Sequence, residues 1–224
     1  MEVQRARRFV VFDLDGTLVD SRLDLARSAN LLLDVYGRAP LGEDAVTAMV
    51  GEGARLLVER VLAAAGAEVP IDAALAQFLD IYDRHLLDTT RPYDGVIDTI
   101  GTLQAQSTLG VLTNKPQRPA EVILEHFGLA KHFADIVGGG GPWPRKPAPD
   151  GLLAMMDRAG AASADTVFVG DSWIDLETAQ AAGVQVCLVR YGFGFPQIPA
   201  SRLRGSEWIV DHPRGWLEVI QRAM

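Results

Sequence analysis

Two hydrophobic patterns alternate along most of the chain. Short unbroken apolar runs are typical of strands buried on both faces of a parallel sheet, and apolar residues that recur every three or four positions are typical of amphipathic helices. The runs predict strands at 9–12, 108–113, 135–137, 166–170, 186–190 and 207–210. The spaced pattern predicts helices at 96–104, 120–127, 149–159, 175–182 and 216–223. This alternation predicts an α/β fold, a Rossmann-like parallel sheet core with helices on both faces.

The alternation is interrupted directly after the first strand. Three helical stretches, at 23–36, 53–65 and 72–87, follow one another with no strand pattern between them. They predict an inserted α-helical cap subdomain, with edges near Val19 and Arg91-Pro92, where polar residues and proline are typical of linkers. We therefore expect a core made of residues 1–19 and 91–224, and a helical cap at 20–90.

Composition and charge narrow the function classes. The net charge of −8 argues against a nucleic-acid partner, which needs a basic face. No segment approaches the length that crosses a bilayer, and the apolar run after Arg5, Arg7 and Arg8 is too short for a signal-peptide core, so no membrane partner is expected. The single cysteine, Cys187, can form no internal disulfide, which fits a reduced, cytoplasmic setting. Monomer and homodimer both stay open.

The most specific stretch of the sequence is FVVFDLDGTLVD, residues 9–20. An apolar run ends at Asp13, and Asp15 follows two positions later, so both carboxylates leave the strand in the same direction. Gly16 permits a sharp turn. Two like charges held this close are costly unless a cation lies between them or one is protonated. An acidic turn without function is the alternative, because Asp and Gly are common loop residues.

Further polar residues follow the later strands. They are Thr113 in VLTNKP, Lys146 in RKPAPD, and Asp171 and Asp175 in VGDSWID. Taken singly, each is also explained by a strand-ending turn, a solvated loop cation, or acidic residues at a helix N-terminus. Ligands of parallel sheets bind at the carboxyl ends of the strands, and Asp13 belongs to the same edge. Their joint occurrence predicts a site for phosphoryl transfer, in which positioning and charge compensation dominate.

Lysine is scarce in this chain. Only Lys115, Lys131 and Lys146 occur, and two of the three precede a proline. Where arginine is the usual surface cation, a retained lysine suggests a role for its compact charge. Compositional drift is the alternative.

DLDGTL, a threonine after an apolar strand, a Lys-Pro and GDSxxD, in this order, resemble the four motifs of the haloacid dehalogenase-like (HAD) superfamily. The resemblance implies that Asp13 is a nucleophile that forms an aspartyl-phosphate, and that Asp15 protonates the leaving group and then activates water. It also implies that Thr113 and Asn114 hold phosphate oxygens and that Lys146 offsets charge on Asp13 and the phosphoryl group.

The same resemblance implies a Mg²⁺ cofactor. Asp13, the backbone carbonyl of Asp15, and Asp171 would be its ligands, and Asp175 would act indirectly, through water or Lys146. The helical insertion resembles a C1-type cap that closes over the site and excludes water. Haloacid dehalogenases themselves lack an acid/base carboxylate, so the presence of Asp15 favours phosphate ester chemistry.

The expected substrate comes from the cap sequence. VGEGARLLVERVL, at 50–62, resembles the corresponding segment of phosphoglycolate phosphatases, in which Gly51 and Gly53 would let a cap loop approach the site. Arg55 would offer a bidentate contact to a substrate carboxylate, or would simply be an exposed arginine on a helix face. The loop Gly139–Gly141 and the nearby Trp143 depart from the family pattern, and their role stays open.

The resulting expectation is a Mg²⁺-dependent phosphomonoesterase that acts through an aspartyl-phosphate and hydrolyses 2-phosphoglycolate to glycolate and phosphate. The alternatives are a phosphatase of the same superfamily for a sugar phosphate, N-acetylmuramate 6-phosphate, a nucleotide or pyrophosphate, and a non-enzymatic phosphometabolite-binding module. An intact set of nucleophile, acid and metal ligands favours the enzyme.

Overall fold

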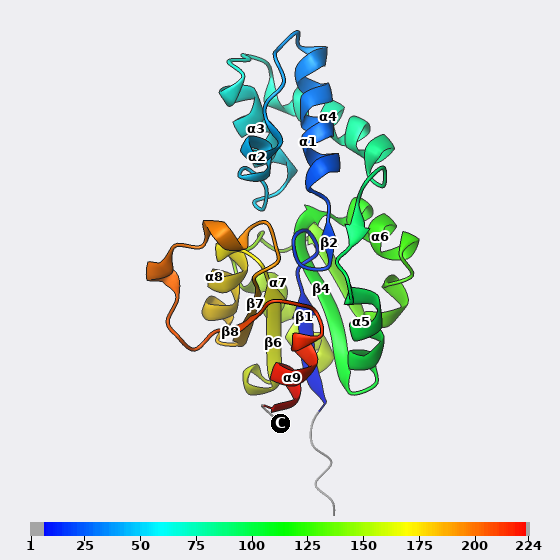
Figure 1. Cartoon of the computed structure of the whole chain (residues 1–224), viewed down its shortest axis with the longest axis vertical. Helices are drawn as coiled ribbons and strands as arrows, with labels where there is room; N and C mark the ends of the chain where they lie inside the picture. The colour runs from blue at the N-terminus through cyan, green and yellow to red at the C-terminus, as the bar shows by residue number, and fades with distance from the viewer. Residues whose placement is uncertain (1–6, 223–224) are drawn as a thin grey trace, which may run out of the picture.

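A computed structural model describes residues 7–222 and shows a parallel sheet below a layer of helices (Figure 1). The sheet has six strands in the order β5-β4-β1-β6-β7-β8, all paired in parallel. The strands are β1 (Arg8–Phe12), β4 (Ser107–Pro116), β5 (Asp135–Gly139), β6 (Thr166–Gly170), β7 (Gln185–Val189) and β8 (Trp208–Val210). The predicted α/β fold is confirmed.

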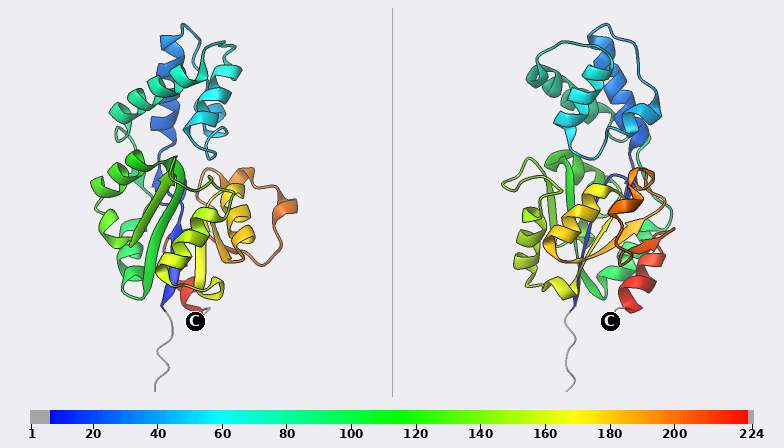
Figure 2. Two further views of the ribbon diagram at one scale, coloured as in Figure 1. Left: turned by 180° about the vertical axis from the view of Figure 1, so that it is seen from behind. Right: turned by 90° about the vertical axis from the view of Figure 1, so that its left-hand side faces the viewer.

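Helices cover both faces of this sheet (Figure 2). They are α5 (Val96–Gln104), α6 (Gln117–His126), α7 (Asp150–Ala159), α8 (Trp173–Ala182) and α9 (Gly215–Arg222). Alternate side chains of β1 point to opposite faces. Val10 and Phe12 join the core that includes residues of α5, α6 and α9, while Phe9 and Val11 join the core that includes residues of α7 and α8. Burial on both faces explains why β1 is apolar throughout its centre.

A second layer lies above the carboxyl ends of the strands (Figure 1). It consists of α1 (Arg22–Val35), α2 (Glu43–Thr47), α3 (Ala54–Ala64) and α4 (Ile71–His85). The chain enters and leaves this layer through an antiparallel pair, β2 (Val19–Asp20) with β3 (Arg91–Pro92). We call α1–α4 the helical layer.

Several short elements were not predicted from the sequence. The helix α2 spans five residues, and the strands β2 and β3 span two each, too short for any periodicity to register. Four single-turn 3₁₀ helices, at Ala130–His132, Ser163–Asp165, Phe195–Gln197 and Ala200–Arg202, were not predicted either. The strand β4 is longer than expected, since it runs beyond Thr113 to Pro116 and so includes Asn114. The terminal helix ends within the described part at Arg222, and the predicted last residue, Ala223, lies outside the described residues.

The sheet order brings the predicted strand ends together. β1 lies between β4 and β6, so Asp13, Thr113 and Asp171 emerge from three adjacent strands. β4 and β5 lie on one side of β1, and β6, β7 and β8 lie on the other, so the strand order reverses at β1. Such a reversal point is where α/β sheets bind ligands. Within residues 7–222, no helix is long and apolar enough to cross a membrane.

Candidate active site

The loop after β1 holds Asp13 in a fixed orientation. The Asp13 backbone N–H donates to the carbonyl of Val169 on β6 at 2.9 Å, and the Leu14 N–H donates to Asp13 Oδ1 at 2.7 Å. Gly16 then turns the chain with a φ of +83°. A Cβ on Gly16 would lie 2.1 Å from Asp171 Oδ2, so only glycine lets the two loops approach this closely.

A buried lysine connects two of the carboxylates. Lys146 Nζ lies 2.9 Å from Asp13 Oδ1 and 2.6 Å from Asp175 Oδ1. Burial alone would lower the pKa of Lys146, but the charges of Asp13 and Asp175 raise it above its ordinary value, so the ammonium keeps its proton. Burial also raises the pKa of Asp13 to about 7, against the opposing effect of Lys146 and with a further upward contribution from Asp175.

Asp175 is held by the start of α8. Ser172 and Asp175 form a capping box, in which Asp175 Oδ2 accepts from the Ser172 N–H at 3.0 Å and from the Ser172 hydroxyl at 2.6 Å. The same oxygen accepts from the Asp171 N–H at 3.2 Å. Both oxygens of Asp175 therefore already have partners, since Lys146 contacts Oδ1.

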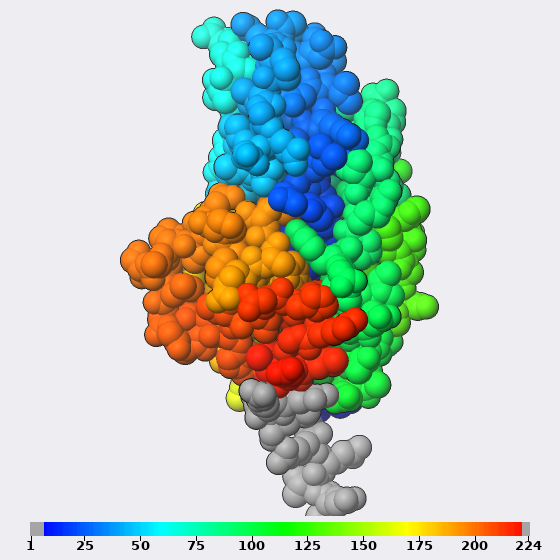
Figure 3. All heavy atoms as spheres, in the orientation of Figure 1, coloured from blue at the N-terminus to red at the C-terminus, as the bar shows by residue number. Residues whose placement is uncertain are grey.

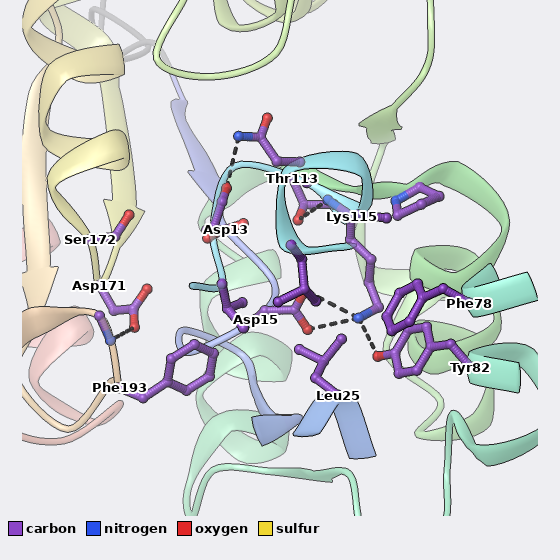
Figure 4. A pocket seen from close by; sticks show the side chains of 18 of the residues that line it. Asp13, Asp15, Leu25, Phe78, Tyr82, Thr113, Lys115, Asp171, Ser172 and Phe193 are labelled. Atoms are coloured by element: carbon purple, nitrogen blue, oxygen red, sulfur yellow. Dashed lines mark hydrogen bonds and ion pairs between the residues drawn. The ribbon is translucent and has the colours of Figure 1, made fainter. Parts of the chain in front are cut away.

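Asp171 faces Asp13 across the loop. Its Oδ2 accepts from the N–H of Gly194 at 2.7 Å, in the segment that follows β7 (Figure 4). Burial raises the pKa of Asp171 well above its usual range, and the charges of Asp175 and Asp13 raise it further. A carboxylate in this position is stable in its charged form only beside a cation.

The site has the composition of a divalent-cation site. One oxygen each from Asp13, Asp171 and Asp175 lie within 4.8 Å of one another. Four carboxylates and two ammonium groups meet here. They belong to Asp13, Asp15, Asp171 and Asp175, and to Lys115 and Lys146. When all six groups are ionised, two negative charges have no compensating positive charge. Hard oxygen donors with this excess charge fit a divalent metal. Asp13 and Asp171 each keep a carboxylate oxygen that can bind a metal, whereas both oxygens of Asp175 already have partners. Asp175 is therefore better suited to hold Lys146 and the start of α8 than to bind the metal directly.

The side chain of Asn114 holds Lys146 in place. Its amide N–H group donates to the Lys146 carbonyl at 2.9 Å, and its Oδ1 accepts from the Lys146 N–H at 2.9 Å. It also donates to the carbonyl of Gly51, in the helical layer, at 2.9 Å. These bonds use the donors and the acceptor of the Asn114 amide. In this structure the side chain therefore supports Lys146, beside the position expected for the phosphate. Thr113 lines the cleft next to Asp13 and Asp15.

A cleft lies between these residues and the helical layer (Figure 4). Gly51 and Gly53 are among the residues that line it. The structure does not bring Arg55 there. Its guanidinium is half-exposed and pairs with Asp72 and Glu59 on the outside of the helical layer. Trp143 and Gly139–Gly141 also lie off this cleft, beside a smaller hollow next to Lys146.

Two contributors to the site had no assigned role in the sequence. Lys115 Nζ lies 3.0 Å from Asp15 Oδ1, and its position in TNKP and the scarcity of lysine were the available signals. The segment after β7, which includes Phe193 and Gly194, forms another wall of the cleft. This segment continues into the excursion that projects from the side of the core below the helical layer (orange in Figure 3). Only folding brings it to Asp171.

The comparisons with known proteins agree with this geometry. The family model of the haloacid dehalogenase-like hydrolases matches residues 10–189. A phosphoglycolate phosphatase of Rhodospirillum rubrum is 44% identical, over 91% of this chain and 98% of that protein. An N-acetylmuramic acid 6-phosphate phosphatase of Pseudomonas aeruginosa is 32% identical, over 96% of this chain and 95% of that protein. The crystal structure of a predicted phosphoglycolate phosphatase from Haemophilus somnus superposes with a TM-score of 0.89 at 32% identity, over 95% and 97% of the two chains.

The chain belongs to the haloacid dehalogenase-like hydrolases. Within that family it is a phosphatase, an enzyme that acts on a small phosphorylated substrate.

Proposed function

We propose that this phosphatase is a Mg²⁺-dependent phosphomonoesterase that hydrolyses 2-phosphoglycolate to glycolate and phosphate through an aspartyl-phosphate on Asp13. The main support for this chemistry is that the side chains of Asp13, Lys146 and Asp171 lie close together at the carboxyl edge of the sheet. The substrate is supported by the 44% and 41% identical phosphoglycolate phosphatases of Rhodospirillum rubrum and Pseudomonas aeruginosa. A reduced, cytoplasmic setting is proposed with it, in keeping with the buried thiol of Cys187.

In the first step, a carboxylate oxygen of Asp13 attacks phosphorus. The bond between phosphorus and the ester oxygen breaks, its electron pair stays on the leaving oxygen, and a protonated Asp15 supplies the proton. Lys146 holds the Asp13 carboxylate and offsets charge on the phosphoryl group, since its Nζ already lies 2.9 Å from Asp13 Oδ1. Thr113 holds a phosphoryl oxygen.

In the second step, Asp15 accepts a proton from water as that water attacks phosphorus. The bond between phosphorus and Asp13 breaks, inorganic phosphate leaves, and the Asp13 carboxylate is restored. Asp13, the Asp15 carbonyl and Asp171 would hold Mg²⁺, which supplies charge compensation for the phosphoryl group. Asp175 keeps Lys146 and the start of α8 in position.

The helical layer acts as a cap in this proposal. Residues 20–90 connect to a core of 1–19 and 91–224 through the β2–β3 pair, which suits a hinge. Closure of the layer would exclude bulk water from the aspartyl-phosphate until the second step.

Phosphate release across a substrate panel tests the proposal. The panel holds 2-phosphoglycolate, hexose phosphates, nucleoside monophosphates, N-acetylmuramate 6-phosphate and pyrophosphate, each with Mg²⁺ and with EDTA. We expect a clear preference for 2-phosphoglycolate that EDTA abolishes, and a loss of at least about 10³-fold in kcat for Asp13→Asn with the fold unchanged.

Each part of the proposal has its own contrary result. Preference for another ester would overturn the substrate, with N-acetylmuramate 6-phosphate the first rival because of the 32% identical relative. Full activity of Asp13→Asn in Mg²⁺ would reject the nucleophile, and undiminished release in EDTA would reject the metal.

A further inference from the structure

Lys115 is a buried cation between the two layers of the molecule. It lies at the end of β4, is 5% exposed, and has Nζ 3.0 and 3.2 Å from the two carboxylate oxygens of Asp15. The same Nζ donates to the hydroxyl of Tyr82, on α4 of the helical layer, at 2.5 Å (Figure 4). Burial alone would lower the pKa of Lys115, but Asp15 and Tyr82 raise it above its ordinary value, so it stays charged.

Tyr82 has a hydroxyl proton to offer. Its oxygen accepts from Lys115, and among residues 7–222 no acceptor receives the Tyr82 O–H. The side chain is 2% exposed and lines the cleft, and its ring stacks on Phe78 with centroids 5.8 Å apart. Burial raises the pKa of Tyr82 to about 12, so the proton stays on the oxygen. A buried donor without an acceptor is costly, which points to a ligand at this place.

The remainder of this wall is apolar. Leu25, Leu57, Phe78 and Leu79 line the same cleft as these two polar groups. Among the described residues that line the cleft, Lys115 is the only lysine or arginine. A second anionic group on a phosphorylated ligand, besides the phosphoryl group at Asp13 and Lys146, therefore has a favourable position against the Lys115 ammonium and the Tyr82 hydroxyl, where weak solvent screening strengthens the contact.

We propose that Lys115 and Tyr82 form the receptor for a carboxylate carried by the leaving group of the substrate, and so select esters with a carboxylate one carbon from the ester oxygen. This inference rests on the proposed function, in which the ester oxygen lies against Asp15. Lys115 lies one hydrogen bond beyond Asp15, and in 2-phosphoglycolate a single methylene separates the ester oxygen from the carboxylate carbon. Because Lys115 belongs to the core and Tyr82 to the helical layer, the same carboxylate bridges the two layers.

A simpler role for Lys115 is to position Asp15 by their ion pair. Two substrates separate these roles: 2-phosphoglycolate, and 2-hydroxyethyl phosphate, which has the same ester but a neutral hydroxymethyl group in place of the carboxylate. The variant Lys115→Gln keeps an N–H donor for Asp15 and removes the charge. Tyr82→Phe removes only the hydroxyl. Lys131→Gln is the matched control, since Lys131 is an exposed lysine on the 3₁₀ turn before β5, outside the cleft.

We expect the unmodified enzyme to prefer 2-phosphoglycolate. Lys115→Gln should lower kcat/KM for 2-phosphoglycolate about 10–100-fold more than for 2-hydroxyethyl phosphate, since it removes a charged hydrogen bond. Tyr82→Phe should raise KM for 2-phosphoglycolate about 5–10-fold with a smaller effect on the neutral ester. Lys131→Gln should change neither substrate.

Contrary outcomes are distinct. Equal losses on both esters in Lys115→Gln would overturn the receptor and leave Lys115 as a positioning residue for Asp15. An unmodified enzyme that hydrolyses both esters equally well would also overturn it. Release from neither ester, with release from another phosphate ester, would instead refute the proposed substrate and with it this receptor. If Lys115→Gln fails to fold, as its unfolding curve would show, the Tyr82→Phe ratio decides alone.

Discussion

Gly192 illustrates how little space separates the loops of the active site. A Cβ on this residue would lie 2.2 Å from Asp171 Cβ and 2.5 Å from the carbonyl oxygen of Gly16. Backbone atoms and a buried carboxylate cannot give way as the end of a flexible side chain can. The absence of a side chain at Gly192 is therefore part of what fixes Asp171.

At the residue scale, we predict that Gly192→Ala displaces Asp171 and weakens Mg²⁺ binding. The expected effect is a rise of about 10–100-fold in the Mg²⁺ concentration needed for half-maximal phosphate release, by analogy with changes to groups that orient metal ligands. Gly101→Ala is the control, because a Cβ there would have no heavy atom within 4 Å apart from its chain neighbours and the backbone of its own helix, α5. A Gly192→Ala enzyme with unchanged Mg²⁺ dependence would show that Asp171 is not held by this contact.

At the scale of elements, Asp24 joins the two ends of the helical layer. This carboxylate, in the first turn of α1, is fully buried and accepts from the N–H groups of Thr89 and Thr90 at 3.0 and 2.7 Å. The hydroxyls of the same threonines donate to it at 2.5 and 2.8 Å. The segment that leaves the layer is thus tied to the helix that enters it, next to the β2–β3 pair.

The pKa of Asp24 gives a prediction for acid stability. Burial raises this pKa, but the four donors outweigh burial and hold it below its usual range. Because the folded-state pKa is the lower one, the carboxylate stabilises the fold at pH values above the unfolded value of about 3.9, and this contribution is lost as the pH falls toward the folded value. Asp24→Asn should therefore lower the free energy of unfolding by about 1–3 kcal/mol at pH 7. Below pH 4, the free energy of unfolding of this variant should fall less steeply with decreasing pH than that of the unmodified protein.

Urea unfolding at pH 7 and at pH 3–4 measures both effects. Asp72→Asn is the control on the same layer, since that side chain is 86% exposed, and it should change the free energy of unfolding by less than about 0.5 kcal/mol. Equal losses in the two variants would contradict a special role for Asp24.

At the scale of the whole molecule, the concentration of negative charge under the helical layer is costly without a cation. Burial raises the pKa of Asp13 to about 7 and that of Asp171 well above its usual range. Since the folded pKa of each exceeds the unfolded value, the metal-free fold binds more protons, and its stability falls as pH rises from about 4 to 7. Mg²⁺ requires the ionised carboxylates, so its stabilising effect must grow over the same range.

We therefore predict a larger increase in Tm with Mg²⁺ at pH 8 than at pH 5. At 100 times the dissociation constant, the ion should add about 2.7 kcal/mol to the free energy of unfolding. Thermal unfolding with Mg²⁺ and with EDTA at both pH values measures the effect, and Asp171→Asn should remove most of it. A Mg²⁺ shift independent of pH, or one retained in Asp171→Asn, would contradict the assigned ligands.

Local chemistry explains what the sequence determined by itself. The apolar run before Asp13 can be satisfied only by burial on both faces of a sheet, and DLDGTL, Lys146 and GDSWID each follow a strand or a loop, so the α/β fold and the shared edge followed from pattern alone. Three of the four helices of the helical layer were predicted. The exception is α2, because its five residues give too little periodicity.

Only the tertiary structure decided which groups share the cleft. Arg55 was expected either to face a substrate carboxylate or to be an exposed arginine on a helix face, and the structure turns it outward to Asp72, while Lys115, 60 positions later, lies beside Asp15 and Tyr82. A helical pattern fixes which face of α3 is apolar, and it does not fix which polar residue meets a strand from the other layer. Contacts between segments 33 and 100 residues apart, such as those of Lys115 with Tyr82 and Asp15, depend on how whole elements pack, and no local spacing encodes them.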